Sequence, residues 1–157
     1  MSKAALTSIN PPHTNNIFSG LKGIEWRTKP MPTGKHYCYE TKKCFGVGKV
    51  IGEFRIWRVV RYENISTIPE GYISSGCVPI EFLEAYSKGR PIYANFIKSP
   101  VKYDKPKELS EYKKINRECW YAYLGLAKRD CPECQNKGCF IQRPPQSWCY
   151  VEELEDI

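Results

Sequence analysis

The chain has 157 residues, of which 41% are hydrophobic and 26% charged, and its formal net charge is +7. This length fits a single domain over residues 1–157, and the apolar fraction excludes a wholly disordered chain. No stretch approaches the ~18 consecutive apolar residues of a transmembrane helix, and the N-terminal segment MSKAALTSINPPH lacks the apolar core of a secretory signal. We therefore expect a cytoplasmic protein with no membrane partner.

The charge is unevenly distributed. Lys and Arg number 24 against 17 acids, and four of those acids lie in the tail 152–157. Residues 88–117 alone hold nine basic groups and three acids. A basic body with an acidic tail predicts a polyanionic partner, with the tail reducing non-specific binding. The alternative is that the charge serves solubility alone.

The predicted elements begin with a short helix over residues 13–19. Asn10 suits the N-cap, Pro11 and Pro12 suit the first turn, and Gly20 suits the left-handed position after the last turn. A second helix is predicted over 79–86.

Alternating or β-rich segments follow the first helix. The predicted strands are residues 23–28, 36–41, 49–62, 92–98 and 141–151. The longest, KVIGEFRIWRVVRY, contains Gly52, which indicates a bend or bulge of the kind that barrel strands show. Residues 99–118 are expected to form a polar loop. The pattern predicts a mainly β (α+β) fold, with a mostly antiparallel, strongly curved sheet or barrel and two or three short helices.

Residues 119–140 differ from the rest and are interpreted as a cysteine-containing insertion. With eight cysteines and no secretion signal, reduced thiols or a metal site are expected rather than disulfides. Three cysteines have a spacing that suits structural zinc, and a fourth ligand would come from either of two others. The three are Cys131, Cys134 and Cys139, and the fourth is Cys119 or Cys149. Free thiols are the alternative.

Four segments occur in an order typical of a known family. They are IFSGLKGIEWR (17–27), YCYETKKCFGVGKVIGEF (37–54), FLEAYSKGRPIYANFI (82–97), and YDKPKELSEY with IQRPPQSWCYVEE (103–153). Together they resemble the ASCH family of the PUA-like superfamily, in the form common in phages and Gram-positive bacteria. The resemblance covers residues 5–153 without the cysteine-rich segment. It implies a small PUA-like β-barrel closed by short helices, and a cleft that receives RNA or a modified nucleotide.

The resemblance also implies site residues. By position, the family's motifs fall on Gly20, Lys22, Glu25 and Arg27, and on Gln146, Ser147 and Trp148. Lys22, expected to pack against little, suits phosphate; Arg27 suits a phosphate or a base edge, and Glu25 a base amino group. Trp148 and Tyr103 would stack a base. The alternatives are a surface Glu25–Arg27 ion pair and a core position for Trp148.

Three classes of function stay open. The main prediction is an RNA- or nucleotide-binding module whose basic cleft lies between the first helix, the following strand and the C-terminal strand. The second is an amidohydrolase or ribonuclease. One ASCH branch combines a lysine with a threonine three residues later; Glu25 stands there in this chain, which leaves Lys22 and Glu25 as acid–base candidates. The third is a phage-type regulator of a host protein. His13 and His36 are expected at the surface.

Overall fold

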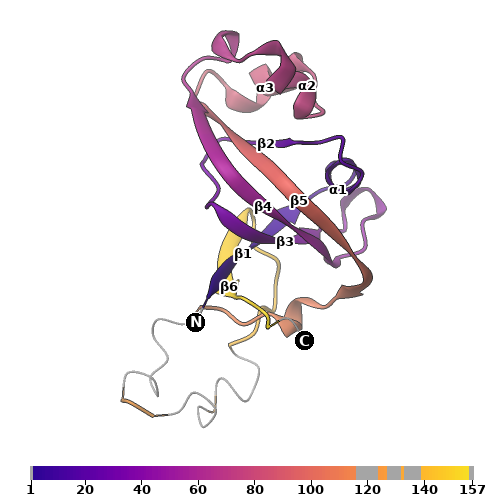
Figure 1. Ribbon diagram of the computed structural model, residues 1–157, viewed down its shortest axis with the longest axis vertical. Coiled ribbons are helices and arrows are strands. Elements are labelled where there is room, and N and C mark those ends of the chain that lie inside the picture. Colours follow the sequence, from indigo (N-terminus) through magenta and orange to yellow (C-terminus); the bar gives the residue numbers. More distant parts are fainter. Residues whose placement is uncertain (1, 116–123, 127–131, 133–138, 156–157) are drawn as a thin grey trace.

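The computed structural model describes residues 2–115, 124–126, 132 and 139–155. Within these ranges, six strands form one sheet in the order β2-β5-β4-β3-β1-β6 (Figure 1). In chain order they are β1 (Lys3–Ile9), β2 (Ile24–Arg27), β3 (Gly34–Glu40), β4 (Lys49–Tyr62), β5 (Ile92–Lys107) and β6 (Trp148–Glu152). The β1–β3 pair is parallel and the other four pairs are antiparallel, so the predicted, mostly antiparallel β architecture is confirmed.

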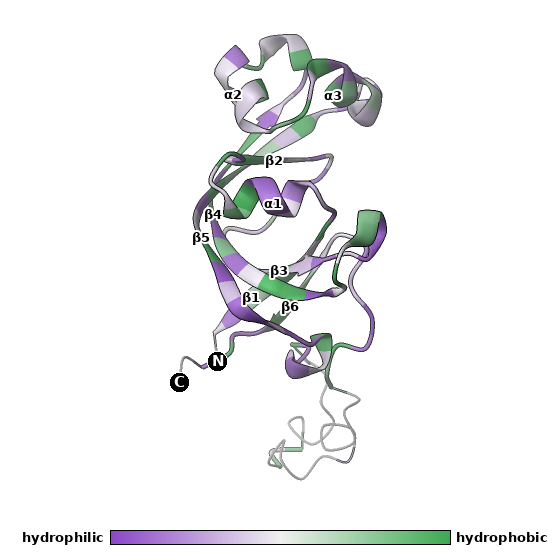
Figure 2. Cartoon of the chain, turned by 90° about the vertical axis from the view of Figure 1, so that its right-hand side faces the viewer, coloured by the Kyte–Doolittle hydropathy of each residue, from purple (hydrophilic) through white to green (hydrophobic). Residues whose placement is uncertain are grey.

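The sheet is strongly curved and barrel-like but is not closed, because β2 and β6 form its two edges (Figure 2). The strand register shifts at three places between β4 and β5 and once between β3 and β4, and such irregularities bend strands. Gly52 lies at two of these shifts, which confirms the predicted bulge. A Cβ atom there would lie 2.4 Å from the Val101 carbonyl oxygen and 2.6 Å from a ring carbon of Phe18. Only glycine lets these elements approach so closely.

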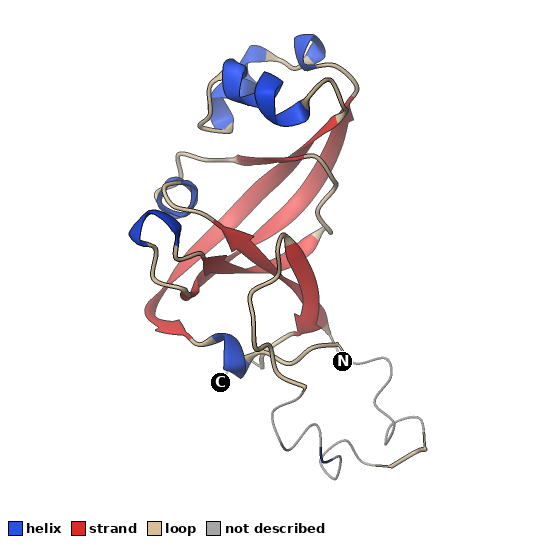
Figure 3. Cartoon of the chain, turned by 180° about the vertical axis from the view of Figure 1, so that it is seen from behind, coloured by secondary structure: helices blue, strands red, loops and turns tan. Residues whose placement is uncertain are grey.

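Short helices cover one face and one end of the sheet. They are α1 (His13–Phe18), α2 (Glu70–Ser75) and α3 (Ile80–Ser87), with 3-10 turns at Lys43–Phe45, Ile65–Thr67 and Leu109–Glu111. Ile17 of α1 is buried against Phe54 and Ile56 of β4. The pair α2–α3 lies beyond β2, at the end of the sheet opposite β6 (Figures 1 and 3). None of the described helices has the length and apolarity needed to cross a bilayer.

Several elements differ from the sequence prediction. Strand β1 and helix α2 were not expected, and β6 begins at Trp148 rather than at residue 141. Strand β5 continues through residues 99–107, which were predicted to be loop. This half of β5 is mostly exposed and lysine-rich, yet it pairs with the first half of β4, so backbone pairing rather than burial extends the strand. Most of the 119–140 insertion lies outside the described residues.

Candidate functional site

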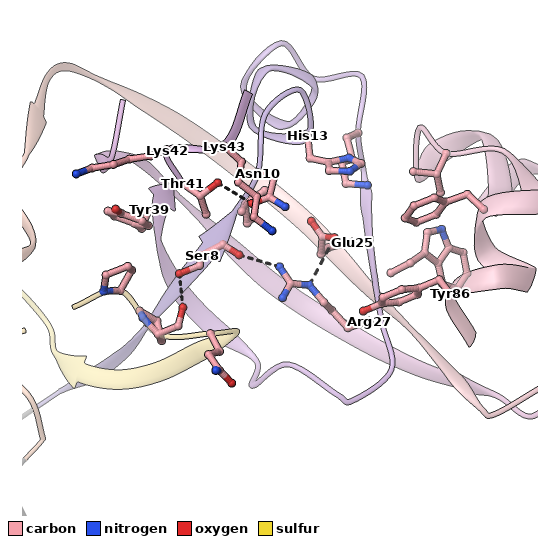
Figure 4. A pocket seen from close by; sticks show the side chains of 18 residues that line it. Ser8, Asn10, His13, Glu25, Arg27, Tyr39, Thr41, Lys42, Lys43 and Tyr86 are labelled. Atoms are coloured by element: carbon pink, nitrogen blue, oxygen red, sulfur yellow. Dashed lines mark hydrogen bonds and ion pairs between the residues drawn. The ribbon is translucent and has the colours of Figure 1, made fainter. Parts of the chain in front are cut away.

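A cavity of about 570 Å³ opens between α1, β2, α3, the turn after β3 and the segment before β6 (Figure 4). This volume lies within the ~300–1,000 Å³ typical of small-molecule sites. Aromatic, cationic and polar side chains line it together. Among them are Trp26, Tyr39, Phe82 and Tyr86, the cations Lys22, Arg27, Lys42 and Lys43, and His13, Glu25, Thr41 and Gln146.

Arg27 joins the two open edges of the sheet. Its Nη1 donates to Ser147 Oγ at 3.1 Å, just before β6, and its Nη2 donates to the Ser8 carbonyl of β1 at 3.1 Å. Its Nε lies 3.6 Å from Glu25 Oε1 (Figure 4). The planar guanidinium therefore links β2 to the segment before β6 across a seam between two edges that are not paired through their backbones among the described strands.

The two carboxylate oxygens of Glu25 have different surroundings among the described residues. The residue is 7% exposed, and while Oε1 faces Arg27, Oε2 is buried and has no hydrogen bond among the described residues. Asn95 fixes the backbone of this strand by donating to the Glu25 carbonyl at 3.0 Å. A buried acceptor without a hydrogen bond costs free energy, so a ligand that donates a hydrogen bond to it would be stabilised.

Lys22 lies in the connection between α1 and β2 and is 3% exposed, so the expectation that it packs against little was wrong. Its ammonium donates to the carbonyl of Gly76, the residue that ends α2. A cation at a helix C-terminus is stabilising. Burial lowers the pKa of Lys22, and nearby Glu25 partly opposes that shift. Through this hydrogen bond, Lys22 connects the cavity wall to the C-terminus of helix α2.

His13 is a cavity residue that sequence reasoning placed at the surface. It is half-buried, at the first position of α1, and its Nδ1 is buried with no partner among the described residues. Burial, followed by the charge of Lys22, lowers the pKa of His13. The other histidine, His36, is fully buried in the sheet and does not line the cavity.

The turn after β3 brings two exposed lysines, Lys42 and Lys43, to the cavity. Thr41 Oγ1 donates to Asn10 Oδ1 at 2.6 Å, which ties this turn to the segment before α1. Glu40, mostly buried, accepts hydrogen bonds from the Thr14 hydroxyl and the Val47 backbone NH. The KK pair in the second family segment was the signal available in the sequence for these two positions.

The remaining predicted residues divide between the cavity and other places. Gln146 lines the cavity and Ser147 belongs to the seam. Gly20, with φ +83°, ends the α1 region as predicted but does not line the cavity. Trp148 is half-buried in β6 and packs edge-on against Tyr150, outside the cavity lining.

Tyr103 is not brought to the cavity either. Its hydroxyl donates to Glu53 Oε1 at 3.0 Å, and its ring packs against the core formed by β1, β3 and β6. Burial raises the pKa of this phenol. The structure therefore gives Tyr103 a packing role rather than the predicted stacking role.

Of the proposed zinc ligands, Cys119, Cys131 and Cys134 lie outside the described residues, and Cys139 is buried. Among the described residues, no group of three or more His, Cys, Asp or Glu side chains is placed to hold a metal ion. The zinc site stays a prediction.

The crystal structure of ASCH from Zymomonas mobilis is similar to this chain, with a TM-score of 0.66 and 19% identity, over 96% of this chain and 88% of that chain. A tyrosine-to-phenylalanine variant of that protein gives a TM-score of 0.67 at 18% identity, over 97% and 92% of the two chains. The fold is that of an ASCH domain. No family model and no curated protein matches the sequence. The similarity spans nearly the whole of both chains, and the fold implied by the four sequence segments is confirmed.

Proposed function

We propose that this ASCH-fold domain binds RNA, or a modified nucleotide, by taking a base into the cavity beside α1 and β2. The observation that carries the proposal is Glu25, which lines a cavity of suitable size and whose buried Oε2 has no hydrogen-bond partner among the described residues. A carboxylate accepts hydrogen bonds from base amino and imino groups, and a base supplies these on its Watson–Crick edge.

The other walls of the cavity suit the rest of a nucleotide. Tyr39, Phe82 and Tyr86 offer ring faces for stacking. Lys42 and Lys43 are exposed at the same cavity and suit phosphate. Four cations line the cavity against one carboxylate, so the electrostatic potential favours an anionic ligand.

The test is binding of fluorescently labelled single-stranded RNA, followed by anisotropy over a range of salt concentrations. We expect Lys42→Glu/Lys43→Glu to weaken binding at least tenfold at low salt. If both lysines contact phosphate, the log–log salt slope should fall by about 1.4, since each contact on a single strand contributes about 0.7. The matched control is Lys102→Glu/Lys105→Glu, which makes the same charge change at exposed positions of β5 outside the cavity. Equal loss of affinity in both variants would exclude the cavity as the binding site.

A second variant tests the base contact itself. Glu25→Gln keeps the shape of the side chain but removes the charged acceptor, and a hydrogen bond to a charged group contributes about 1.5–3 kcal/mol. We expect an affinity loss of about tenfold or more with an unchanged salt slope. Unchanged affinity in a folded Glu25→Gln protein would refute recognition by this carboxylate.

A hydrolase acting on a nucleoside amide or on RNA is the second candidate, because Lys22, Glu25 and His13 line the same cavity. The lowered pKa values of Lys22 and His13 favour the neutral forms that act as general bases. Product formation, followed by chromatography, should then disappear in His13→Ala and in Lys22→Met while RNA binding by His13→Ala persists. Absence of product with the wild-type protein would exclude the hydrolase and leave the binding proposal intact.

A further inference from the structure

Helix α3 carries two neighbouring aromatic rings, of which Tyr86 packs against the core around Ile24 and Trp26 and Phe82 is exposed. Phe82 and Tyr86, one helical turn apart, stack with ring centroids 5.8 Å apart and an interplanar angle of 13°. Phe82 is 48% exposed, whereas Leu83 of the same helix is fully buried and anchors α3 to the core around Ile24 and Trp26. The anchoring of α3 therefore does not explain the exposed ring of Phe82.

The same two rings separate the main cavity from a second hollow. Phe82 and Tyr86 line both, and the second hollow, of about 450 Å³, is completed by Thr28, Ala85, Lys88 and Arg90. Its lining contains two cations and no carboxylate. Glu84 of α3 lines a neighbouring depression beside residues 63–66, and Arg90 lines both that depression and the second hollow.

These two cations lie at the C-terminal end of α3, and one of them is tethered there. Lys88 adopts the left-handed conformation that ends the helix, with φ +50°. The Arg90 side chain is tethered through Nε, which donates to the Ser87 carbonyl at 3.4 Å. No other hydrogen bond of the guanidinium is present among the described residues, so its terminal nitrogens remain available to a ligand.

Resting on the proposed function, we propose that the ligand is a single-stranded RNA segment that continues from the cavity across α3. One base occupies the cavity, the neighbouring base stacks on the exposed face of Phe82, and the phosphates that follow lie against Lys88 and Arg90. Stacking on an exposed ring together with a cationic groove is how proteins hold single strands without reading their sequence. A lone nucleotide would fill the cavity and leave the second hollow unused.

The experiment compares ligand lengths. Affinities of nucleoside monophosphates and of labelled tetranucleotides of each base are measured by competition anisotropy at one salt concentration. We expect the best tetranucleotide to bind at least tenfold more tightly than its mononucleotide. Lys88→Glu/Arg90→Glu should remove most of that increment and leave mononucleotide affinity unchanged, since neither side chain lines the main cavity. The Lys102→Glu/Lys105→Glu protein is the charge control.

The stacking contact has its own variants. Phe82→Ala should weaken tetranucleotide binding about tenfold, and Phe82→Trp should restore it. Phe45→Ala is the matched control, because Phe45 is a fully exposed phenylalanine that lines neither hollow.

Three outcomes would overturn the proposal. One is equal affinity for mononucleotide and tetranucleotide in the wild-type protein, which leaves the cavity proposal standing. Another is loss of mononucleotide and tetranucleotide binding by the same factor in Lys88→Glu/Arg90→Glu. The third is a tetraglutamate peptide that competes as well as the tetranucleotide, which would assign the second hollow to an acidic protein segment. Failure of every nucleotide to bind would refute the cavity proposal as well.

Discussion

The buried histidine of the sheet predicts a specific pH dependence of stability. His36 stacks on Phe54 with ring centroids 5.4 Å apart, its Nε2 lies 2.7 Å from the Pro32 carbonyl oxygen, and its Nδ1 lies 2.7 Å from Thr7 Oγ1. A carbonyl only accepts, so Nε2 carries the proton and Nδ1 accepts from the Thr7 hydroxyl. The neutral ring is fully hydrogen-bonded. Burial, with a smaller contribution from the charge of Arg27, lowers the pKa of His36 from 6.5 to about 4.

The sign and size follow from proton linkage. Between pH 6.5 and pH 4 the unfolded chain binds a proton at His36 that the folded protein does not, so the free energy of unfolding falls as the pH falls through this window. The loss at pH 5 relative to pH 7.5 is about 2 kcal/mol, and it reaches about 3 kcal/mol at pH 4. Above pH 6.5 the contribution is fully present.

Urea denaturation at pH 7.5 and pH 5.0 measures this contribution by difference. His36→Gln removes the titrating group, so we expect the wild-type protein to lose about 2 kcal/mol more than this variant between the two pH values. His13, whose pKa is also lowered, adds a loss of the same sign, and His13→Gln should therefore keep the His36 contribution. Equal losses in wild type and His36→Gln would refute the assignment of a neutral buried ring.

Three further predictions concern the seam, the bulge and the metal. Arg27→Met should lower the free energy of unfolding by about 2–4 kcal/mol in urea, because two charge-assisted hydrogen bonds across the seam are lost; a loss below about 0.5 kcal/mol would show that the seam is held otherwise. Gly52→Ala should cost about 1–3 kcal/mol in the same assay through overlap with Val101 and Phe18, and an unchanged midpoint would contradict the bulge geometry. For the cysteines of segment 131–139, we expect one equivalent of zinc in tag-free protein and a lower melting temperature in chelator; less than half an equivalent with no change in melting temperature would exclude the site.

The sequence predicted the elements in which local pattern and tertiary role agree. The long alternating run of β4 with its bulge at Gly52 is one, and the C-terminal end of the first helix before Gly20 is another. The predicted N-cap of that helix was wrong, because Pro12 takes this position and the Asn10 side chain accepts from Thr41 instead. The sequence pattern did not predict elements whose structure depends on pairing with strands distant in sequence. Strand β1 has no alternation, because successive residues are buried on both of its faces. The second half of β5 contains two prolines and several lysines. Helix α2 is only six residues long and buries none of them, so no periodic signal marks it.

The sequence predicted which residues line the candidate site better than it predicted what their side chains do there. Lys22, Glu25, Arg27 and Gln146 do line one cavity. Their roles depend on partners that are distant in sequence: Lys22 bonds to a carbonyl 54 residues away, and Arg27 to a hydroxyl 120 residues away. Burial and pairing at such separations leave no local pattern. His13 was missed for the same reason, since its position in the cavity depends on how α1 docks against the sheet.

Lys22 and Arg27 of the glycine–lysine–glutamate–arginine motif therefore stabilise the walls of the cavity more than they bind a ligand. Lys22 is committed to the carbonyl at the end of α2, and Arg27 to the seam and to one oxygen of Glu25. A ligand that competed for either cation would break a hydrogen bond of the fold, and the exchange would yield little net affinity. What remains for recognition is the second oxygen of Glu25, the aromatic rings, and the exposed lysines that follow β3. Substitutions at Lys22 and Arg27 should consequently appear first in stability, whereas Glu25→Gln and Lys42→Glu/Lys43→Glu should appear first in binding. If substitutions at Lys22 and Arg27 instead weakened binding before they lowered stability, the anion site would lie at these two cations.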